Sequence, residues 1–206
     1  MKCLVTGGSG FIGSAIVKEL VRDGHEVRVL SRSIKDNLID KEFLRDVEFI
    51  KGDVRDLTVV GRASQKCDYI YNFSGIIDSD AANCLSVDAI DTEIIGLQNI
   101  CRSSKKNNIK KIIFGSSCAV YGDNNRGGPL LEKYPVQPKS HYATLKRMGE
   151  LLLQTYSNEM NLNYLIVRMF NPYGSKQPKN MVIHQFFEAA SKGVPIKIFG
   201  RGDQAR

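Results

Sequence analysis

One tyrosine and one lysine in this chain have the spacing that would let them share a proton-transfer task. Tyr142 and Lys146 are four residues apart, so on a helix both side chains face the same way. A phenol ordinarily loses its proton near about pH 10, and a neighbouring ammonium stabilises the phenolate. The pair could therefore act as an acid or base near neutral pH. A hydroxyl from the preceding Ser116-Ser117 could hydrogen-bond the oxygen that reacts.

A glycine-rich segment at the start of the chain indicates what would work beside this pair. Residues 2–6 (KCLVT) read as a short strand and run directly into GGSGFIG at 7–13, and an apolar-periodic helix follows. Glycines permit a tight turn and let backbone N–H groups approach phosphate at the positive end of a helix dipole. This context is typical of a dinucleotide pyrophosphate site. With a nicotinamide nearby, Tyr142 could help oxidise an alcohol or reduce a ketone, and Lys146 could hold the nicotinamide ribose.

The end of the second expected strand bears on the choice of dinucleotide. Residues 25–30 (HEVRVL) read as that strand, and Ser31-Arg32-Ser33 follow it without an acidic residue. A site for NAD usually has Asp or Glu there for the ribose hydroxyls, whereas an Arg favours the 2′-phosphate of NADP. We therefore expect NAD or NADP, with NADP favoured by Arg32.

Strands and helices alternate along the whole chain, and the alternation predicts how these residues are brought together. Further strands are expected at 47–51, 68–73, 111–115, 162–168 and 196–199, and helices at about 81–104, 140–159 and 181–192. Regular β-α-β alternation predicts an α/β fold with a doubly wound parallel sheet. Ligands of such sheets bind at the carboxyl ends of the strands. The glycines, Arg32, Asp53, Phe73-Ser74-Gly75, Ser116-Ser117 and Asn171 all fall at those ends.

Composition narrows the class of protein. The chain has 206 residues, 42% hydrophobic and 25% charged, which is typical of a soluble domain, and no apolar run approaches a membrane span. Five scattered cysteines and three isolated histidines give no metal-ligand spacing and favour reduced thiols in a cytoplasm. The net charge is +7, but the lysine run at 105–111 has no interleaved aromatic residues, so we expect no nucleic-acid partner.

Six segments together resemble a known family, the extended short-chain dehydrogenases/reductases, and within it the NAD-dependent epimerase/dehydratase family with its nucleotide-sugar 4-epimerases. The segments cover nearly the whole chain in the family's order: TGGSGFIG at 6–13, GDV at 52–54, SSCAVYG at 116–122, YATLK at 142–146, RMFNPYG at 168–174 and IFGRGDQAR at 198–206. The resemblance implies a Rossmann domain, a tightly held NAD or NADP, and a nucleotide-diphosphate sugar as substrate.

The resemblance also implies roles for individual residues. Ser117, Tyr142 and Lys146 would be catalytic, and Asp53 and Val54 would lie near the adenine. The substrate-binding residues would be Ser117, Asn171 and Arg206, the last of which would grip the diphosphate. The expected cofactor-binding residues are Gly7, Gly10, Phe11, Ile12, Gly13, Ser31, Arg32, Asp53, Val54, Phe73, Ser74, Gly75, Tyr142, Lys146 and Phe170. Without the resemblance, Asp53 reads equally as a turn residue and Asn171 as a strand-end cap.

The sequence departs from the family's pattern at several positions. Glu93 stands where the family usually has Asn, which changes the polarity of the site wall. Leu145 replaces a common Ser, and Arg201 a common Asp. Cys118-Ala119 follow the candidate catalytic serine in place of the acidic pair of the 4,6-dehydratases, so that branch is disfavoured.

These observations lead to one main hypothesis and two alternatives. Residues 1–170 are expected to form an NAD(P)-binding Rossmann domain, and residues 171–206 part of a smaller substrate-binding lobe, so the chain reads as a fragment that binds dinucleotide but turns over sugar poorly. The expected activity is epimerisation of a nucleotide-diphosphate sugar through a transient keto intermediate. The alternatives are an NADP-dependent ketoreductase and a non-catalytic NAD(P)-binding sensor or scaffold. A homodimer is compatible with each. We also expect an exposed apolar patch around Val182, Phe186 and Phe187.

Overall fold

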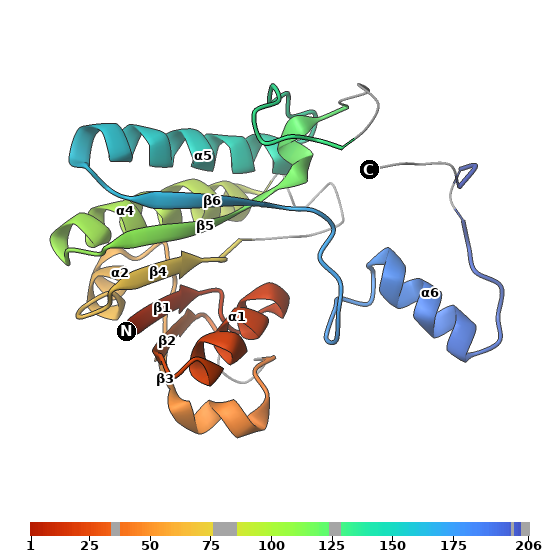
Figure 1. Cartoon of the computed structure of the whole chain (residues 1–206), viewed down its shortest axis with the longest axis horizontal. Coiled ribbons are helices and arrows are strands. Elements are labelled where there is room, and N and C mark those ends of the chain that lie inside the picture. Colours follow the sequence, from red (N-terminus) through yellow and green to blue (C-terminus); the bar gives the residue numbers. More distant parts are fainter. Residues whose placement is uncertain (34–37, 76–85, 124–128, 199, 203–206) are drawn as a thin grey trace. The chain divides into compact units, whose positions relative to one another are not determined.

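A six-stranded parallel sheet runs through the centre of residues 1–171 (Figure 1). The computed structural model describes all residues except 34–37, 76–85, 124–128, 199 and 203–206. The strands are β1 (Lys2–Thr6), β2 (Glu26–Ser31), β3 (Val47–Lys51), β4 (Tyr69–Asn72), β5 (Lys111–Ser117) and β6 (Tyr164–Met169). Their order across the sheet is β3-β2-β1-β4-β5-β6, so the chain starts in the middle and winds outward twice. This is the Rossmann order, and it confirms the expected doubly wound α/β fold.

Helices connect the strands. Before β5 they are α1 (Phe11–Arg22), the 3₁₀ helix η1 (Lys41–Asp46), α2 (Leu57–Ala63), α3 (Val87–Ile90), the π-helical turn η2 (Asp91–Ile95) and α4 (Gly96–Lys106). After β5 come the 3₁₀ helix η3 (Cys118–Tyr121), α5 (His141–Met160) and α6 (Val182–Ser191). The long helix that the sequence predicts over 81–104 is a composite, because the π turn divides its described part.

Successive strand residues point to opposite faces of the sheet, and each face carries its own core. Leu4, Ile70 and Phe114 belong to the core under α2, α4 and α5. Cys3 and Val5 belong to the core under α1 and η1. The near-continuous burial of β1 and β2 follows from this, since a parallel sheet is covered on both sides.

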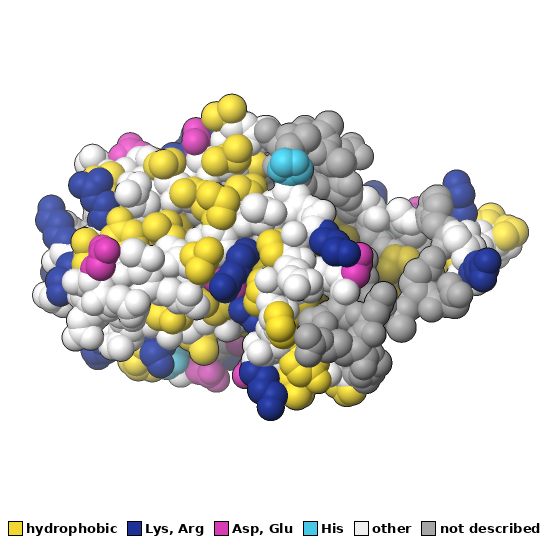
Figure 2. Space-filling view, turned by 90° about the horizontal axis from the view of Figure 1, so that it is seen from above, with side chains coloured by type: hydrophobic (Ala, Val, Ile, Leu, Met, Phe, Trp, Pro, Cys, Tyr) yellow, Lys and Arg dark blue, Asp and Glu magenta, His cyan; other side chains and the backbone are white. Residues whose placement is uncertain are grey.

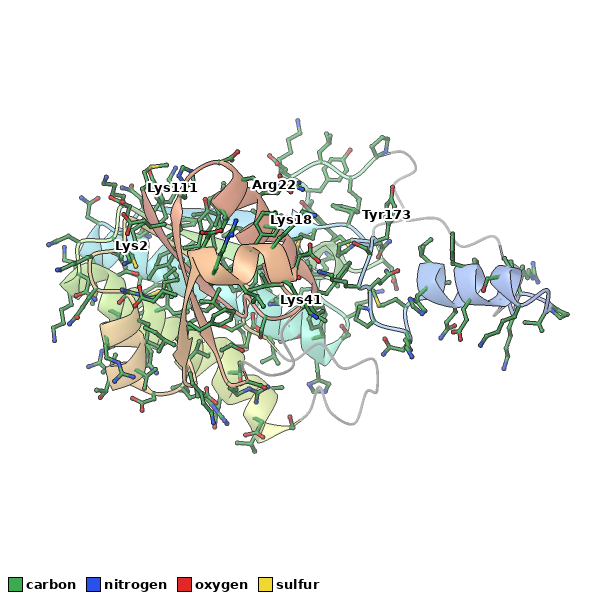
Figure 3. The ribbon with its side chains drawn as sticks, turned by 90° about the horizontal axis from the view of Figure 1, so that it is seen from below. Lys2, Lys18, Arg22, Lys41, Lys111 and Tyr173 are labelled. Atoms are coloured by element: carbon green, nitrogen blue, oxygen red, sulfur yellow. The ribbon has the colours of Figure 1, made fainter. Side chains whose placement is uncertain are left out.

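On the sheet face that α1 covers, the 3₁₀ helix η1 packs beside α1. Figure 3 labels Lys18 and Arg22 on α1, and both cations lie over the ring of Phe43 in η1, at 5.8 and 5.5 Å from its centroid. Lys18 also pairs with Asp40, at 3.5 Å. These contacts hold the described part of the segment between β2 and β3 against α1.

On the opposite side, the long helix α5 presents apolar side chains outward. Figure 2 looks onto this side and shows hydrophobic side chains gathered over it. The large exposed ones on α5 are Met148 and Leu151. No helix in the described part of the chain is long and apolar enough to cross a membrane.

The chain separates into two compact units, Met1–Asn171 and Pro172–Arg206. In the second unit, α6 has no buried residue. Val182 and Phe187 are 56% and 79% exposed, as expected, while Phe186 is half-buried. The strand predicted over 196–199 is wrong for its described residues, because residues 196–198 carry no regular structure. A strand needs a hydrogen-bonded neighbour, and alternation in sequence alone does not supply one.

Candidate active site

The glycines after β1 are required by the backbones that surround them. Gly7 has a φ of +69°, and a Cβ built on it would lie 2.5 Å from the carbonyl oxygen of Phe73. A Cβ on Gly13 would lie 2.2 Å from the carbonyl oxygen of Gly7. Both distances are far below van der Waals contact, so no larger residue fits without moving backbone. The glycines therefore let α1, β1 and the end of β4 approach one another closely.

The first turn of α1 has the properties of an anion site. Gly10 caps the helix without a side-chain hydrogen bond, and the first turn contains no acidic residue. Gly10 N–H donates to the Gly7 carbonyl at 3.0 Å, which closes the loop. Phe11 and Ile12, the first helical residues, are half-buried. The helix N-terminus therefore fits a pyrophosphate, whose oxygens would accept from amides that no side chain caps.

The end of β2 is tied to this loop. The Ser31 and Ser9 hydroxyl oxygens are 2.6 Å apart, and Ser31 also donates to the Ser33 carbonyl at 2.9 Å. Arg32 is exposed beside them. Ser31 thus has a structural task that its position in the sequence did not reveal, while Arg32 extends into solvent.

The turn after β3 is held by an ion pair and an amide. Asp53 accepts from Arg55 at 2.8 Å, and this hydrogen bond, aided by the nearby Arg32, holds the pKa of Asp53 below its usual range. Asn99 donates its side-chain amide to the carbonyls of Val54 and Arg55, at 3.0 and 2.8 Å. Val54 itself is buried in the core.

The segment after β4 forms the next part of this sheet edge. Ser74 donates to the Asn72 amide oxygen at 2.6 Å, and Thr6 of β1 donates to the same oxygen at 2.7 Å. Phe73 packs against β5, where a Cβ on Gly115 would lie 2.7 Å from its ring. These contacts fix Phe73 and Ser74 between the glycine-rich loop and β5.

The two serines that end β5 have different environments. Ser116 is fully buried, and its hydroxyl donates to Glu150 at 2.7 Å. Ser117 is half-buried, and its hydroxyl accepts from the Ala119 N–H at 3.2 Å. Ser117 is thus the serine whose hydroxyl is open toward a ligand.

Tyr142 and Lys146 lie on the first turns of α5. Ser140 caps this helix by accepting from the Ala143 N–H at 3.2 Å, as the sequence predicts. The Lys146 ammonium nitrogen is 5.9 Å from the centre of the Tyr142 ring and 5.2 Å from that of Phe114 in β5. Tyr142 is half-buried and Lys146 buried, so α5 carries the pair against the end of the sheet.

Lys146 has a buried acidic partner. Its ammonium nitrogen is 2.8 Å from a carboxylate oxygen of Glu93 in η2. The two side chains are 7% and 6% exposed. Gly75, next along from Phe73 and Ser74, adjoins both groups: a methyl group built there would lie 3.1 Å from Glu93 Oε2 and 3.5 Å from Lys146 Nζ.

A second buried carboxylate supports the same helix one turn later. Glu150 is fully buried and accepts from both ends of the Arg168 guanidinium at 2.8 Å, from Arg147 at 2.9 Å and from Ser116. Burial raises the pKa of Glu150, but these hydrogen bonds outweigh it and hold the pKa below the usual range. The network joins α5, β5 and β6, and so fixes the helix that carries Tyr142.

Comparison with known proteins identifies the family. Residues 3–206 match the model of the NAD dependent epimerase/dehydratase family. The chain belongs to this family.

Individual relatives agree with the assignment. A UDP-N-acetyl-alpha-D-glucosaminuronate decarboxylase of Bacillus cytotoxicus is 31% identical, over 100% of this chain and 66% of the relative. The UDP-N-acetylglucosamine 4-epimerase of Methanobrevibacter ruminantium, solved with UDP-N-acetylmuramic acid, has a TM-score of 0.89 at 30% identity, over 98% of this chain and 66% of that one. The Thermus thermophilus UDP-glucose 4-epimerase, solved with NAD, has a TM-score of 0.84 at 30% identity. The match covers 95% of this chain and 64% of that one. The chain spans about two thirds of the length of these relatives.

The remaining predicted site residues of this epimerase/dehydratase-family chain lie at or beyond the end of β6. Phe170 is exposed, with its ring 6.3 Å from that of Tyr121. Asn171 has a φ of 38°, a left-handed conformation that asparagine tolerates better than most residues. Arg206 lies outside the described residues.

Sequence reasoning missed several residues that hold the site of this family member in place. Ser9, Arg55 and Asn99 each fix a segment at the carboxyl edge of the sheet. Glu93 was noticed as a departure from the family pattern, but nothing in the sequence indicated Lys146 as its partner. The only available signal was chemical: the carboxylate of a glutamate needs a cation when it is buried.

Proposed function

We propose that this protein is an NAD-dependent epimerase of a nucleotide-diphosphate sugar, working through a transient keto intermediate. One observation carries the proposal: a continuous series of neighbouring residues links the glycine-rich loop to the Tyr-Lys pair. Gly7 adjoins Phe73, Gly75 adjoins Lys146, and Lys146 adjoins Tyr142. An extended dinucleotide could therefore have its pyrophosphate at α1 and its nicotinamide beside Tyr142.

The residues then divide the chemistry between them. When bound, NAD would take a hydride from a sugar carbon and return it to the other face of that carbon. Tyr142 would remove the proton from the hydroxyl on that carbon. It would return the proton after the keto sugar has rotated to present its other face. Ser117 would donate a hydrogen bond to the same oxygen, and the Lys146 ammonium would favour the phenolate form of Tyr142.

NAD is favoured over NADP as the cofactor. Membership of an NAD-dependent family and a relative solved with NAD support NAD. The preference for NADP rests on exposed Arg32 alone, because Ser31 already bonds Ser9 and Ser33. A tightly retained NAD would suit an epimerase, and an exchangeable NADPH the alternative ketoreductase.

The substrate class is inferred from relatives and from the end of β6. A relative solved with a UDP-linked sugar acid supports a nucleotide-diphosphate sugar. Asn171 stands at the carboxyl edge of the sheet, where its amide could reach phosphate oxygens. Cys118 and Ala119, in η3, stand where the 4,6-dehydratases have an acidic pair, so epimerisation is preferred to dehydration. We also infer a cytoplasmic enzyme, in keeping with four free cysteines among the described residues.

The proposal is tested by Tyr142→Phe in a form of the protein that turns over UDP-glucose. The variant should lose turnover by on the order of 10²–10⁴-fold, because a positioned acid/base contributes about that much. Its affinity for NAD, measured by calorimetry, should stay within about threefold of the wild type. Tyr156→Phe, at the far end of α5, is the matched control and should keep its activity. Full activity in Tyr142→Phe would overturn the proposed role of Tyr142 as the acid/base.

A further inference from the structure

The buried pair of Lys146 and Glu93 is not explained by the proposed chemistry. That chemistry needs the ammonium of Lys146 to stabilise a phenolate and to hold a ribose. In this chain the ammonium is already 2.8 Å from a carboxylate that is itself 6% exposed. A carboxylate at that distance opposes the effect that the ammonium has on Tyr142.

The groups around Lys146 determine which charges act on its ammonium. Within the described part of the chain, four segments place a group near Lys146. These groups are Glu93 from η2, Tyr142 from α5, the Phe114 ring from β5 and the Gly75 backbone from the segment after β4. Asp88 of α3 is paired with Arg55, at 2.6 Å. Glu93 is therefore the described acidic group that acts on Lys146 directly, and the two side chains are in buried contact.

Glu93 reaches Lys146 from an unusual stretch of helix. Asp91–Ile95 is a π turn between α3 and α4, and its residues Thr92 and Glu93 are buried. Such turns add a residue to a helix and often occur at functional sites. The second carboxylate oxygen adjoins Gly75, which is exposed, so Glu93 also borders the wall expected to face the cofactor.

Building on the proposed function, we propose that Glu93 is a positioning residue of the site. It holds the Lys146 ammonium at the cofactor wall, and its negative charge cancels much of the positive charge that Tyr142 and a bound dinucleotide would otherwise meet. Tyr142 therefore lies beside a nearly neutral ion pair, and a ligand that drew Lys146 away from Glu93 would leave Tyr142 beside an uncompensated ammonium.

The direct test is the ionisation of Tyr142, followed by the ultraviolet absorbance of tyrosinate in the chain without cofactor. Each protein is compared with the same protein carrying Tyr142→Phe, so that the difference reports Tyr142 alone. Glu93→Gln keeps the shape and removes the charge, and should lower the titration midpoint by about one pH unit. Lys146→Met should raise it by a similar amount. Glu48→Gln, at another ion pair on β3, is the control and should leave it unchanged.

If Glu93→Gln does not fold, the double variant Glu93→Gln/Lys146→Met still tests the proposal. The double variant should fold, because it leaves no unpaired buried charge. Its midpoint should match that of the wild type. If Glu93 is only structural, the double variant will instead titrate like Lys146→Met, and the proposal is overturned. Calorimetry with NAD on the same proteins tests the proposed function separately: absence of NAD binding in the wild type would reject that function, whatever the order of the midpoints.

Discussion

The NADP alternative rests on one exposed side chain at the end of β2. Arg32 has the charge to bind a 2′-phosphate, while Ser31 is occupied by Ser9 and Ser33. If Arg32 governs selection, Arg32→Asp should weaken NADP at least tenfold relative to NAD, because a carboxylate repels the phosphate and accepts from ribose hydroxyls. Titration of both dinucleotides against both proteins measures the ratio. Arg45→Asp, another exposed arginine, is the control. Wild-type affinity for NAD equal to or above that for NADP would show that Arg32 does not set a preference.

Glu150 should make the stability of the protein depend on pH. Its pKa in the folded state lies below the ordinary value of 4.5, so its contribution is fully present above that value and is lost as the pH falls through the folded pKa. Glu150→Gln should lower the free energy of unfolding at pH 7 by about 3 kcal/mol, because it leaves the half-buried Arg168 without its fully buried charge partner.

Urea unfolding at several pH values measures both proteins. The gap between wild type and Glu150→Gln should shrink progressively as the pH is lowered from about 4.5, since the wild-type carboxyl then becomes neutral as well. A gap that stays constant down to pH 3 would mean that Glu150 does not titrate differently in the folded and unfolded states.

The residue scale also shows how far the sequence could lead. The four-residue spacing of Tyr142 and Lys146 is local, and a helix converts it directly into proximity. Glu93 is 53 positions from Lys146 and Arg168 is 18 from Glu150, so both partnerships depend on how separate elements pack. Sequence reasoning could place the Tyr-Lys pair, but it could not find the buried carboxylates that hold and balance it.

Among the elements, the junction of β1 and α1 tolerates little increase in side-chain size. Gly13→Ala would put a methyl group 2.2 Å from the Gly7 carbonyl oxygen. We expect a loss of at least about 2 kcal/mol in the free energy of unfolding, because only backbone movement can relieve the clash. The distorted loop should also bind NAD at least tenfold more weakly. Denaturant unfolding and calorimetry test the two effects.

Gly61→Ala is the matched control, because Gly61 lies inside α2 and its new methyl group would be 3.8 Å from the nearest atom, Ser103 Oγ. It should stabilise the protein by roughly 0.5–1 kcal/mol through helix propensity and leave NAD binding unchanged. Similar behaviour of the two variants would contradict the steric account of the glycine-rich loop.

Element prediction succeeded where local pattern and tertiary demand agree. The strands buried on both faces and the capped helix α5 have strong local signals, and each lies close to its expected range. The π turn at Asp91–Ile95 has no such local signal, and it lies against α4 and α5, which are later in the chain. The stretch 196–198 has strand-like composition but no regular structure, since a strand is a property of a pair.

For the whole molecule, the described candidate cofactor residues and both hydrophobic cores fall within one unit. The cores contain residues no later in the chain than Ile166, and the unit is Met1–Asn171. The glycine-rich loop, Arg32, Asp53, Ser117 and the Tyr-Lys pair are all included. Dinucleotide binding should therefore be a property of this unit alone.

A protein consisting of residues 1–171 should accordingly fold and bind NAD within about threefold of the affinity of the 206-residue chain. Its cores are complete, and removal of Pro172–Arg206 takes away a unit with far fewer internal contacts and a helix with no buried residue. Circular dichroism and calorimetry check folding and binding, and Gly13→Ala in the shorter protein provides the binding-deficient control. Loss of NAD binding on truncation, with the fold intact, would show that residues 172–206 contribute directly to the cofactor site and would move the boundary between cofactor and substrate recognition toward the end of the chain.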